Sequence, residues 1–264
     1  MNDVQFGICC EPEITEIYAD AGFDYFECSI SAVFQGGKSD AEATGYAERL
    51  AKAALPCRSG NGFIPAAYRI TGPEVDRAAN REYSERVIRR AAECGLETMV
   101  FGSGGARRCP DGFSMETAAL QVQTFLEDMI PALEKYGMTI AIEPLNTAEC
   151  NILLSVAAGA VLTARIGHPR IRLLADSYHF LKTDLSLDSL TWSMPLVRHV
   201  HLGTVPNRLA PGQEECDGLK TFLAVLKHGG YRGRMSIESG HGPDLRKDAR
   251  ESIAYLRETW ASIE

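Results

Sequence analysis

The chain has 264 residues and a formal net charge of −8, from 27 Lys and Arg against 35 Asp and Glu. Its 45% hydrophobic and 23% charged residues are typical of a globular protein and exclude a disordered tail, a collagen-like fibre and a coiled coil. No run approaches the ~20 apolar residues of a membrane span, and the start MNDVQFGICC lacks a signal-peptide pattern. The excess of acidic residues disfavours nucleic acid as a partner. We therefore expect a cytoplasmic protein that binds neither membrane nor nucleic acid.

Eight short β-rich runs recur along the chain, each followed by a polar turn. In chain order they are QFGICC (5–10), FDYFECSI (23–30), LPCRSGNGF (55–63), ETMVFGSG (97–104), TIAIEPLN (139–146), IRLLADSYHF (171–180), VRHVHLG (197–203) and RMSIES (234–239). Near-continuous apolar stretches such as TMVF and TIAI are typical of parallel strands that are buried on both faces.

Helical patterns occupy the longer intervals between these runs. They cover residues 73–95, 114–137, 155–169, 216–230 and 244–260. In the second of them, Ser114 is a candidate N-cap and Gly137 a candidate C-terminal stop. Pro131 lies inside the same helix and is expected to kink or divide it.

This alternation of strands and helices favours one (β/α)₈ TIM barrel, a single domain over residues 1–264, since such barrels have about 250 residues. A doubly wound sheet is the alternative, but its first strand is usually followed by a Gly-rich turn, whereas here CCEPE follows. The eight cysteines have no CxxC spacing, and we interpret them as reduced thiols that pack as small apolar groups.

The chemistry of a TIM barrel lies at the C-terminal ends of its strands. Four consecutive predicted strands end on polar residues that can bind a metal: Glu143, Asp176, His201 and Glu238. His199 lies two residues before His201 and deeper in the same strand, where a hydrogen-bonded core histidine is the expected role.

Three converging carboxylates repel one another unless protons or a cation offset their charge. A divalent cation solves this problem, and three carboxylate oxygens with one imidazole nitrogen are suitable ligands for Mn²⁺, Mg²⁺, Co²⁺ or Zn²⁺. The sequence therefore predicts one divalent metal ion, with Mn²⁺ the first candidate.

These segments resemble a known family. AIEPLN, LLADSYH, HVHLG followed by NRLAPG, and MSIES are similar to motifs of the xylose-isomerase-like TIM-barrel superfamily, in its branch of sugar isomerases, ketose 3-epimerases and hydroxypyruvate isomerases. The resemblance extends over essentially the whole chain, in strand order. It implies a metal held by the same four residues that the strand ends select.

The resemblance also implies substrate-binding residues. The histidine of the Asp-x-x-His pair is His179, the glutamate after the Glu-x-x-Asn motif is Glu149, and the arginine before the APG stretch is Arg208. Thr204 departs from the pattern, because ketose 3-epimerases often have a glutamate there. This departure bears on the substrate and not on the metal ligands.

The expected reaction removes a proton from the carbon next to a carbonyl in a small ketose, sugar phosphate or hydroxy-keto acid. The metal would stabilise the enediolate as a Lewis acid. Glu143 and Glu238 are the candidate acid and base. Two bases on opposite faces of the substrate suit epimerisation, whereas one shuttling base suits aldose–ketose isomerisation.

The Gly-rich stretch FGSGGARR (101–108) has two interpretations. Its backbone amides can form an anion nest with Arg107 or Arg108 facing a phosphate. Alternatively, the glycines allow close loop packing at the barrel mouth and the arginines are solvated.

Other functions remain open at this stage. The first alternative is a keto-inositol-type dehydratase, which uses similar ligands on the same barrel. The second is an apurinic-site endonuclease of this superfamily, which needs several zinc ions and more histidines than this chain offers. The third is a non-catalytic sugar-binding barrel, against which the intact ligand set argues. The expected partner is a small carbohydrate, and the candidate assemblies are a homodimer or a homotetramer.

Overall fold

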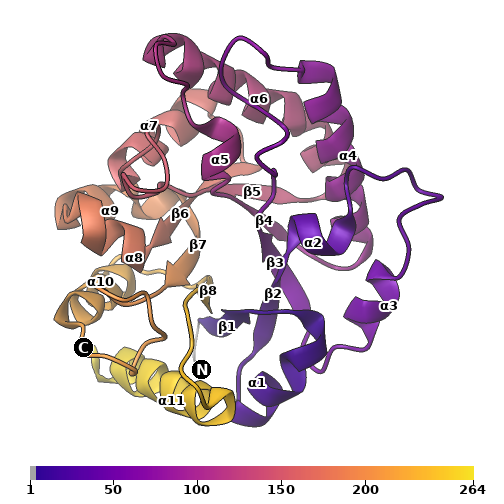
Figure 1. Ribbon diagram of the computed structural model, residues 1–264. Coiled ribbons are helices and arrows are strands. Elements are labelled where there is room, and N and C mark those ends of the chain that lie inside the picture. Colours follow the sequence, from indigo (N-terminus) through magenta and orange to yellow (C-terminus); the bar gives the residue numbers. More distant parts are fainter. Residues whose placement is uncertain (1–3) are drawn as a thin grey trace.

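The eight predicted runs form a closed parallel barrel in the computed structural model, which describes residues 4–264 (Figure 1). The strands are β1 (Gln5–Cys9), β2 (Tyr25–Ser29), β3 (Cys57–Asn61), β4 (Thr98–Phe101), β5 (Thr139–Ile142), β6 (Ile171–Asp176), β7 (Val197–Leu202) and β8 (Arg234–Ile237). Each strand pairs with the next, and β8 closes the barrel against β1, with Gly7 beside Ser236. The predicted (β/α)₈ barrel is therefore confirmed, and the doubly wound sheet is excluded.

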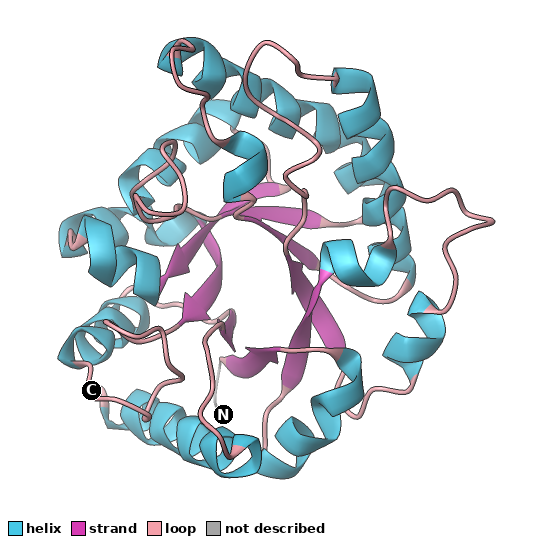
Figure 2. Ribbon diagram, viewed as in Figure 1, coloured by secondary structure: helices cyan, strands magenta, loops and turns pink. Residues whose placement is uncertain are grey.

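Helices surround the barrel as an outer ring (Figure 2). The five predicted helices are present as α4 (Arg77–Glu93), α6 (Met115–Tyr136), α7 (Val156–Ile166), α10 (Asp217–His228) and α11 (Leu245–Ser262). Shorter helices that the sequence patterns did not indicate are α1 (Thr15–Ala21), α2 (Ile30–Phe34), α3 (Tyr46–Ala51), α5 (Gly104–Arg107), α8 (Ser177–His179) and α9 (Leu187–Ser193). A helix of three to seven residues has too few turns to show a 3.6-residue period.

The ends of α6 follow its sequence signals. The Ser114 hydroxyl accepts a hydrogen bond from the backbone N–H of Thr117 at 3.2 Å, and Gly137 ends the helix in the left-handed conformation at φ +71°. Pro131 lies inside α6, which runs without a break from residue 115 to residue 136. Pro131 therefore does not divide the helix, since loss of one N–H donor leaves the rest of the helix paired. The predicted kink stays a prediction.

The interior of the barrel has an apolar floor below the predicted site. Val100, Ala141 and Leu174 form a small buried cluster, separate from the larger core between strands and helices. Because side chains alternate along a strand, Ala141 shares a face with Glu143, and Leu174 shares a face with Asp176. The predicted ligands therefore project into the barrel interior above a packed apolar layer.

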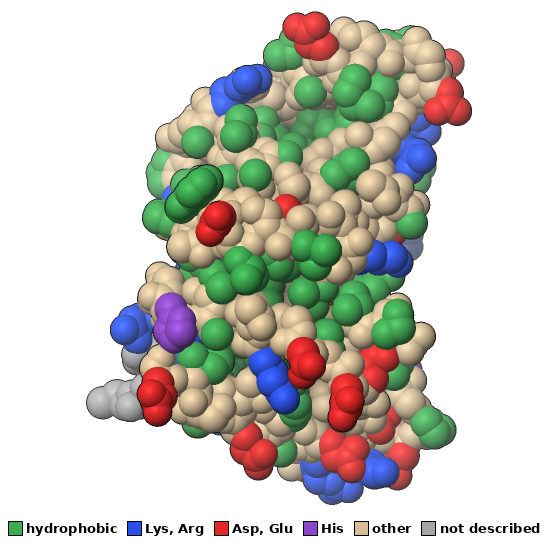
Figure 3. All heavy atoms as spheres, turned by 90° about the vertical axis from the view of Figure 1, so that its left-hand side faces the viewer, with side chains coloured by type: hydrophobic (Ala, Val, Ile, Leu, Met, Phe, Trp, Pro, Cys, Tyr) green, Lys and Arg blue, Asp and Glu red, His purple; other side chains and the backbone are tan. Residues whose placement is uncertain are grey.

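One side of the molecule carries exposed apolar side chains. Trp192 of α9 is 80% exposed, and Leu185 and Leu187 beside it are also exposed. Figure 3 shows this side, with hydrophobic groups scattered among polar ones and acidic groups gathered toward its lower rim. Within residues 4–264, no helix combines the length and the apolar character that a membrane crossing requires. The predicted assembly into two or four copies stays a prediction.

Candidate active site

The four predicted metal ligands meet at the C-terminal end of the barrel. Glu143 directly follows β5, Asp176 ends β6, His201 lies in β7 and Glu238 directly follows β8. One ligand atom from each residue lies within 4.8 Å of the other three. The cluster is buried, with His201 at 0% and Asp176 at 2% exposure, and only Glu238 retains a partly accessible side chain.

Distances in this cluster suit a single small cation. His201 Nδ1 lies 3.1 Å from Glu143 Oε1, 3.3 Å from Glu238 Oε2 and 3.9 Å from Asp176 Oδ2. Ligands about 2.0–2.2 Å from one ion are about 3.0–3.6 Å apart. Asp176 Oδ2 is buried and accepts no hydrogen bond from any group in residues 4–264. An orphaned buried carboxylate oxygen inside this donor set indicates a site that fits a divalent metal ion.

The pKa values show the same excess of negative charge. Burial raises the pKa of Glu143 and of Asp176, and the nearby Glu238 carboxylate raises both further. Burial opposes the ionisation of Glu238 as well, but His201 and Arg208 together hold its pKa at about 2. His201 is surrounded by carboxylates that outweigh its burial and keep its pKa well above the usual range. The carboxylates thus compete for positive charge at a single point.

The three predicted substrate-binding residues lie beside this cluster. His179 Nε2 is 3.9 Å from both Asp176 Oδ2 and Glu149 Oε2, and its Nδ1 is 2.8 Å from the side-chain nitrogen of Asn146. The Asn146 amide also donates to Glu149 Oε1 at 2.9 Å. His179 is therefore held by Asn146, which the sequence patterns did not single out.

Arg208 links the metal cluster to the outer part of the site. Its Nη2 lies 2.7 Å from Glu238 Oε2, and its Nη1 lies 3.3 Å from Glu149 Oε1. The guanidinium carbon is 4.7 Å from the centre of the Tyr178 ring, which is a cation–π contact. All seven residues selected from the sequence are thus brought together at one mouth.

A cavity of about 300 Å³ opens beside the cluster. Its lining includes Cys9, Tyr18, Asn61, Ser239 and His241. Asn61 Nδ2 donates to Glu238 Oε1 at 2.8 Å, so the cavity adjoins a proposed ligand. The volume suits a small polyhydroxylated molecule.

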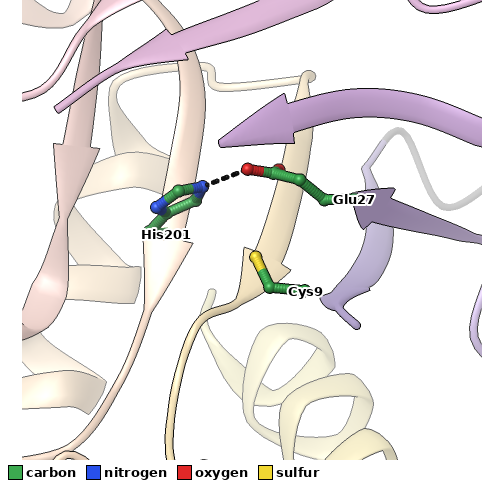
Figure 4. Close-up of side chains that lie close together, drawn as sticks. All are labelled: Cys9, Glu27 and His201. Atoms are coloured by element: carbon green, nitrogen blue, oxygen red, sulfur yellow. Dashed lines mark hydrogen bonds and ion pairs between the residues drawn. The ribbon is translucent and has the colours of Figure 1, made fainter. Parts of the chain in front are cut away.

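Sequence reasoning missed Glu27, the carboxylate at the centre of the barrel interior. It lies in the middle of β2 at 0% exposure, and its Oε1 is 2.9 Å from His201 Nε2 (Figure 4). The available signal was a charged residue within the otherwise apolar run FDYFECSI. Charged residues are almost never fully buried unless they are paired, so this position pointed to a polar barrel interior.

His199 has the role that the sequence predicted for it. It is 1% exposed, and its Nε2 lies 2.7 Å from Glu27 Oε2. It is therefore a hydrogen-bonded core histidine that does not face the ligand cluster.

The Gly-rich stretch packs closely around Glu143 and does not offer Arg107 to a phosphate. Arg107 is fully buried and donates to the backbone oxygens of Phe101 at 3.2 Å and Glu143 at 2.7 Å. A Cβ at Gly102 would lie 2.3 Å from Glu143 Oε2. Close loop packing is therefore confirmed, whereas the expectations of a phosphate-facing or a solvated Arg107 are wrong. Arg108 is exposed.

Thr204 faces its own loop. It is buried, and its hydroxyl donates to Glu214 and accepts from the backbone N–H of Leu209 at 3.1 Å. Thr204, where ketose 3-epimerases often have a glutamate, therefore helps to hold the loop that carries Arg208.

The fold and site together define a class. A closed parallel barrel that gathers three carboxylates and a histidine at its C-terminal mouth is a TIM barrel built around a candidate metal centre. More closely, the chain belongs to the xylose isomerase-like TIM barrel family, whose model matches residues 16–259.

Individual relatives agree with this assignment. The Mus musculus protein named "Putative hydroxypyruvate isomerase" is 26% identical over 192 residues, which cover 70% of this chain and 67% of the mouse protein. A structure of D-psicose 3-epimerase in the presence of D-fructose matches with a TM-score of 0.82 and 18% identity, covering 98% of this chain and all of the other.

Two further structures show the same fold. The 3-keto-D-glucoside 4-epimerase YcjR from E. coli has a TM-score of 0.80 and 19% identity over 97% of this chain and 99% of its own. The IOLI protein with a binding zinc atom has a TM-score of 0.76 and 14% identity over 98% and 99%.

Proposed function

We propose that this protein is a divalent-metal-dependent sugar isomerase or epimerase. It acts on a small ketose, sugar phosphate or hydroxy-keto acid by removing a proton from the carbon next to the carbonyl. The observation that carries the proposal is the buried cluster of Glu143, Asp176, His201 and Glu238, with an Asp176 oxygen that no group within residues 4–264 satisfies. The epimerases and the zinc-binding protein of the same fold, together with the mouse relative, support it.

Glu143, Asp176, His201 and Glu238 would hold the metal. When bound, a divalent ion supplies Lewis-acid polarisation of a carbonyl and an adjacent hydroxyl. The mixed set of oxygens and one nitrogen suits Mn²⁺ first and also Mg²⁺, Co²⁺ or Zn²⁺.

Glu143 and Glu238 are the proposed acid and base. They follow β5 and β8, which are three strand positions apart in a ring of eight, so the two carboxylates enter the mouth from nearly opposite sides. A substrate carbon between them would face one carboxylate on each side. One would remove the proton and the other would return it, an arrangement that favours epimerisation over a single-base isomerisation.

His179, Glu149 and Arg208 are the proposed substrate-binding residues. Burial lowers the pKa of His179, so its imidazole is neutral. Nδ1 accepts from Asn146, which leaves Nε2–H to donate to a sugar oxygen. Arg208 bridges Glu238 and Glu149 and presents donors for substrate oxygens between them. The cavity lined by Asn61 and His241 would hold the rest of the molecule.

A dehydratase on the same ligand set is the second candidate. It begins with the same proton removal, and therefore only the products distinguish it. An endonuclease is less well supported, since His179 and His201 contact carboxylates of the cluster whereas His199 bonds to Glu27 instead.

The test is solvent exchange on a panel of ketoses, sugar phosphates and hydroxypyruvate in deuterated water with Mn²⁺. The metal is removed by a chelator before proton spectra are recorded. Loss of one C–H signal identifies the substrate and the carbon, and a new epimer, an isomer or a dehydrated product identifies the reaction class.

Matched variants assign the roles. Glu143→Gln and Glu238→Gln should each abolish the exchange, while Glu97→Gln, which changes a carboxylate bonded to Arg234 of β8, should retain it. Exchange that persists in either of the first two variants would remove that glutamate from the proposed acid–base pair. Metal analysis that finds three zinc ions per chain would favour the endonuclease instead.

A further inference from the structure

Glu27 projects from β2 into the barrel interior and bonds to the neighbouring strand β3 and to β7 and β8. Its two oxygens take four hydrogen bonds: from Ser59 Oγ at 2.7 Å, His199 Nε2 at 2.7 Å, Ser236 Oγ at 2.8 Å and His201 Nε2 at 2.9 Å. A carboxylate only accepts, and so both histidines must carry their hydrogen on Nε2. Oε2 accepts three of these bonds, and Oε1 accepts the one from His201.

This network selects one tautomer of His201. With Nε2–H directed at Glu27, the other nitrogen, Nδ1, faces Glu143 Oε1 at 3.1 Å and Glu238 Oε2 at 3.3 Å. In the neutral ring, only that nitrogen can offer a lone pair to a cation at the mouth. The ring can neither rotate nor exchange its nitrogens without breaking the bond to Glu27.

A purely structural role explains this carboxylate poorly. Moving a charge into a barrel interior is costly, and well-packed apolar side chains often replace buried ion pairs without loss of stability. Glu27 is nevertheless fully buried there, and two of its four donors are imidazole nitrogens. A carboxylate that accepts from the far nitrogen of a ligand histidine orients the ring and makes it a stronger donor.

We infer that Glu27 is a positioning residue for the metal centre, which acts through His201 by fixing the tautomer and orientation of its ring. This inference rests on the proposed metal-dependent function. It connects a residue on β2, in the first half of the barrel, with proposed ligands that all lie on or directly after β5 to β8.

A second metal site in the same place is a weaker explanation. Cys9, Glu27 and His201 also offer ligand atoms within 4.8 Å of one another (Figure 4). However, the Glu27 and His201 atoms concerned already bond to each other, and Glu27 has three further donors. Burial and the Glu27 charge also raise the pKa of the Cys9 thiol well above its usual value, which opposes a thiolate.

The test compares Co²⁺ binding to the wild type and to Glu27→Gln. We expect a 10- to 100-fold weaker affinity by calorimetry, as is typical for loss of such a partner, and a shifted visible spectrum of the Co²⁺ protein. Ser59→Ala is the matched control, because it removes one donor to Glu27 and leaves the bond to His201; its affinity should stay within about threefold of the wild type. Equal affinity and an equal spectrum in Glu27→Gln would overturn the inference.

A measurement on the wild type covers the case in which Glu27→Gln does not fold. With ¹¹³Cd²⁺ bound and histidines labelled with ¹⁵N, we expect coupling from cadmium to Nδ1 of His201 and a protected Nε2–H. Coupling to Nε2 would overturn the role of Glu27 alone. A wild type that binds neither Co²⁺ nor Cd²⁺ would overturn the proposed function itself, and the role of Glu27 with it.

Discussion

The substitution Gly102→Ala tests the geometry of the site without replacing any of the proposed metal ligands. Gly102 follows β4, and its φ lies outside the left-handed region, so alanine introduces no backbone strain there. A Cβ would lie 2.3 Å from Glu143 Oε2. The carboxylate oxygen must therefore move by about 0.7 Å to reach even a tight 3.0 Å contact, and by more than 1 Å to reach 3.4 Å.

Such a displacement is large for a metal ligand and for an acid–base group. Metal–ligand distances are held within about 0.2 Å, and a misplacement of about 1 Å at a reacting group costs on the order of 10²-fold in rate. We expect Gly102→Ala to lower both the affinity for Mn²⁺ and the rate of C–H exchange, the latter by about 100-fold, with an unchanged far-UV spectrum.

The control is Gly105→Ala, three residues further on in α5. There the nearest atom to a new Cβ is Ala66 Cβ at 3.0 Å, and the residue is exposed and far less constrained. This variant should bind metal and exchange protons at rates close to the wild type. If Gly102→Ala matched the wild type in both assays, the close approach of the loop to Glu143 would have no part in the site.

Three further predictions concern charge and capping. Asp176→Asn should weaken cation binding at least about 100-fold by calorimetry, and should raise the Tm of the metal-free protein by about 2–4 °C because a buried charge is removed; unchanged binding would exclude Asp176 as a ligand. Arg234 holds the pKa of Glu97 below its ordinary value through bonds of 2.9 and 3.1 Å, so this pair stabilises the fold above about pH 4.5 and the contribution is lost as the pH falls. Glu97→Gln should therefore reduce the difference in the free energy of unfolding between about pH 6 and about pH 3.5, measured by urea titration, by less than about 1 kcal/mol for so exposed a pair. An equal difference in both proteins would contradict this. Ser114→Ala should cost about 1 kcal/mol in urea unfolding by removing the cap on the Thr117 N–H, and an unchanged midpoint would show that this cap adds no stability.

The features that could be predicted from the sequence are those that leave a repeated pattern of apolar and polar residues along it. Buried parallel strands leave near-continuous apolar runs, and the polar residue that ends each run marks the barrel mouth. For this reason Glu143, Asp176, His201 and Glu238 were found from strand ends alone, and the structure places them within 4.8 Å. The long helices were found for the same reason, because each has several turns of apolar period.

The remaining features depend on contacts between distant segments. Glu27 bonds to residues 32 to 209 positions away, and no local pattern reports such a pairing. Arg107 looked like a surface arginine beside glycines, yet its guanidinium bonds to backbone oxygens of β4 and of the segment after β5. Asn146 gained its role only when α8 brought His179 against it.

The order of the ligands along the chain has a consequence for metal loading during synthesis. Glu238 follows β8, the strand that also closes the barrel against β1, while Glu143, Asp176 and His201 come from earlier strands. Closure of the barrel and completion of the ligand set are therefore the same event. A chain that has not yet paired β8 offers at most three of the four proposed ligands, and so a metal ion would meet the complete set only after the barrel has closed.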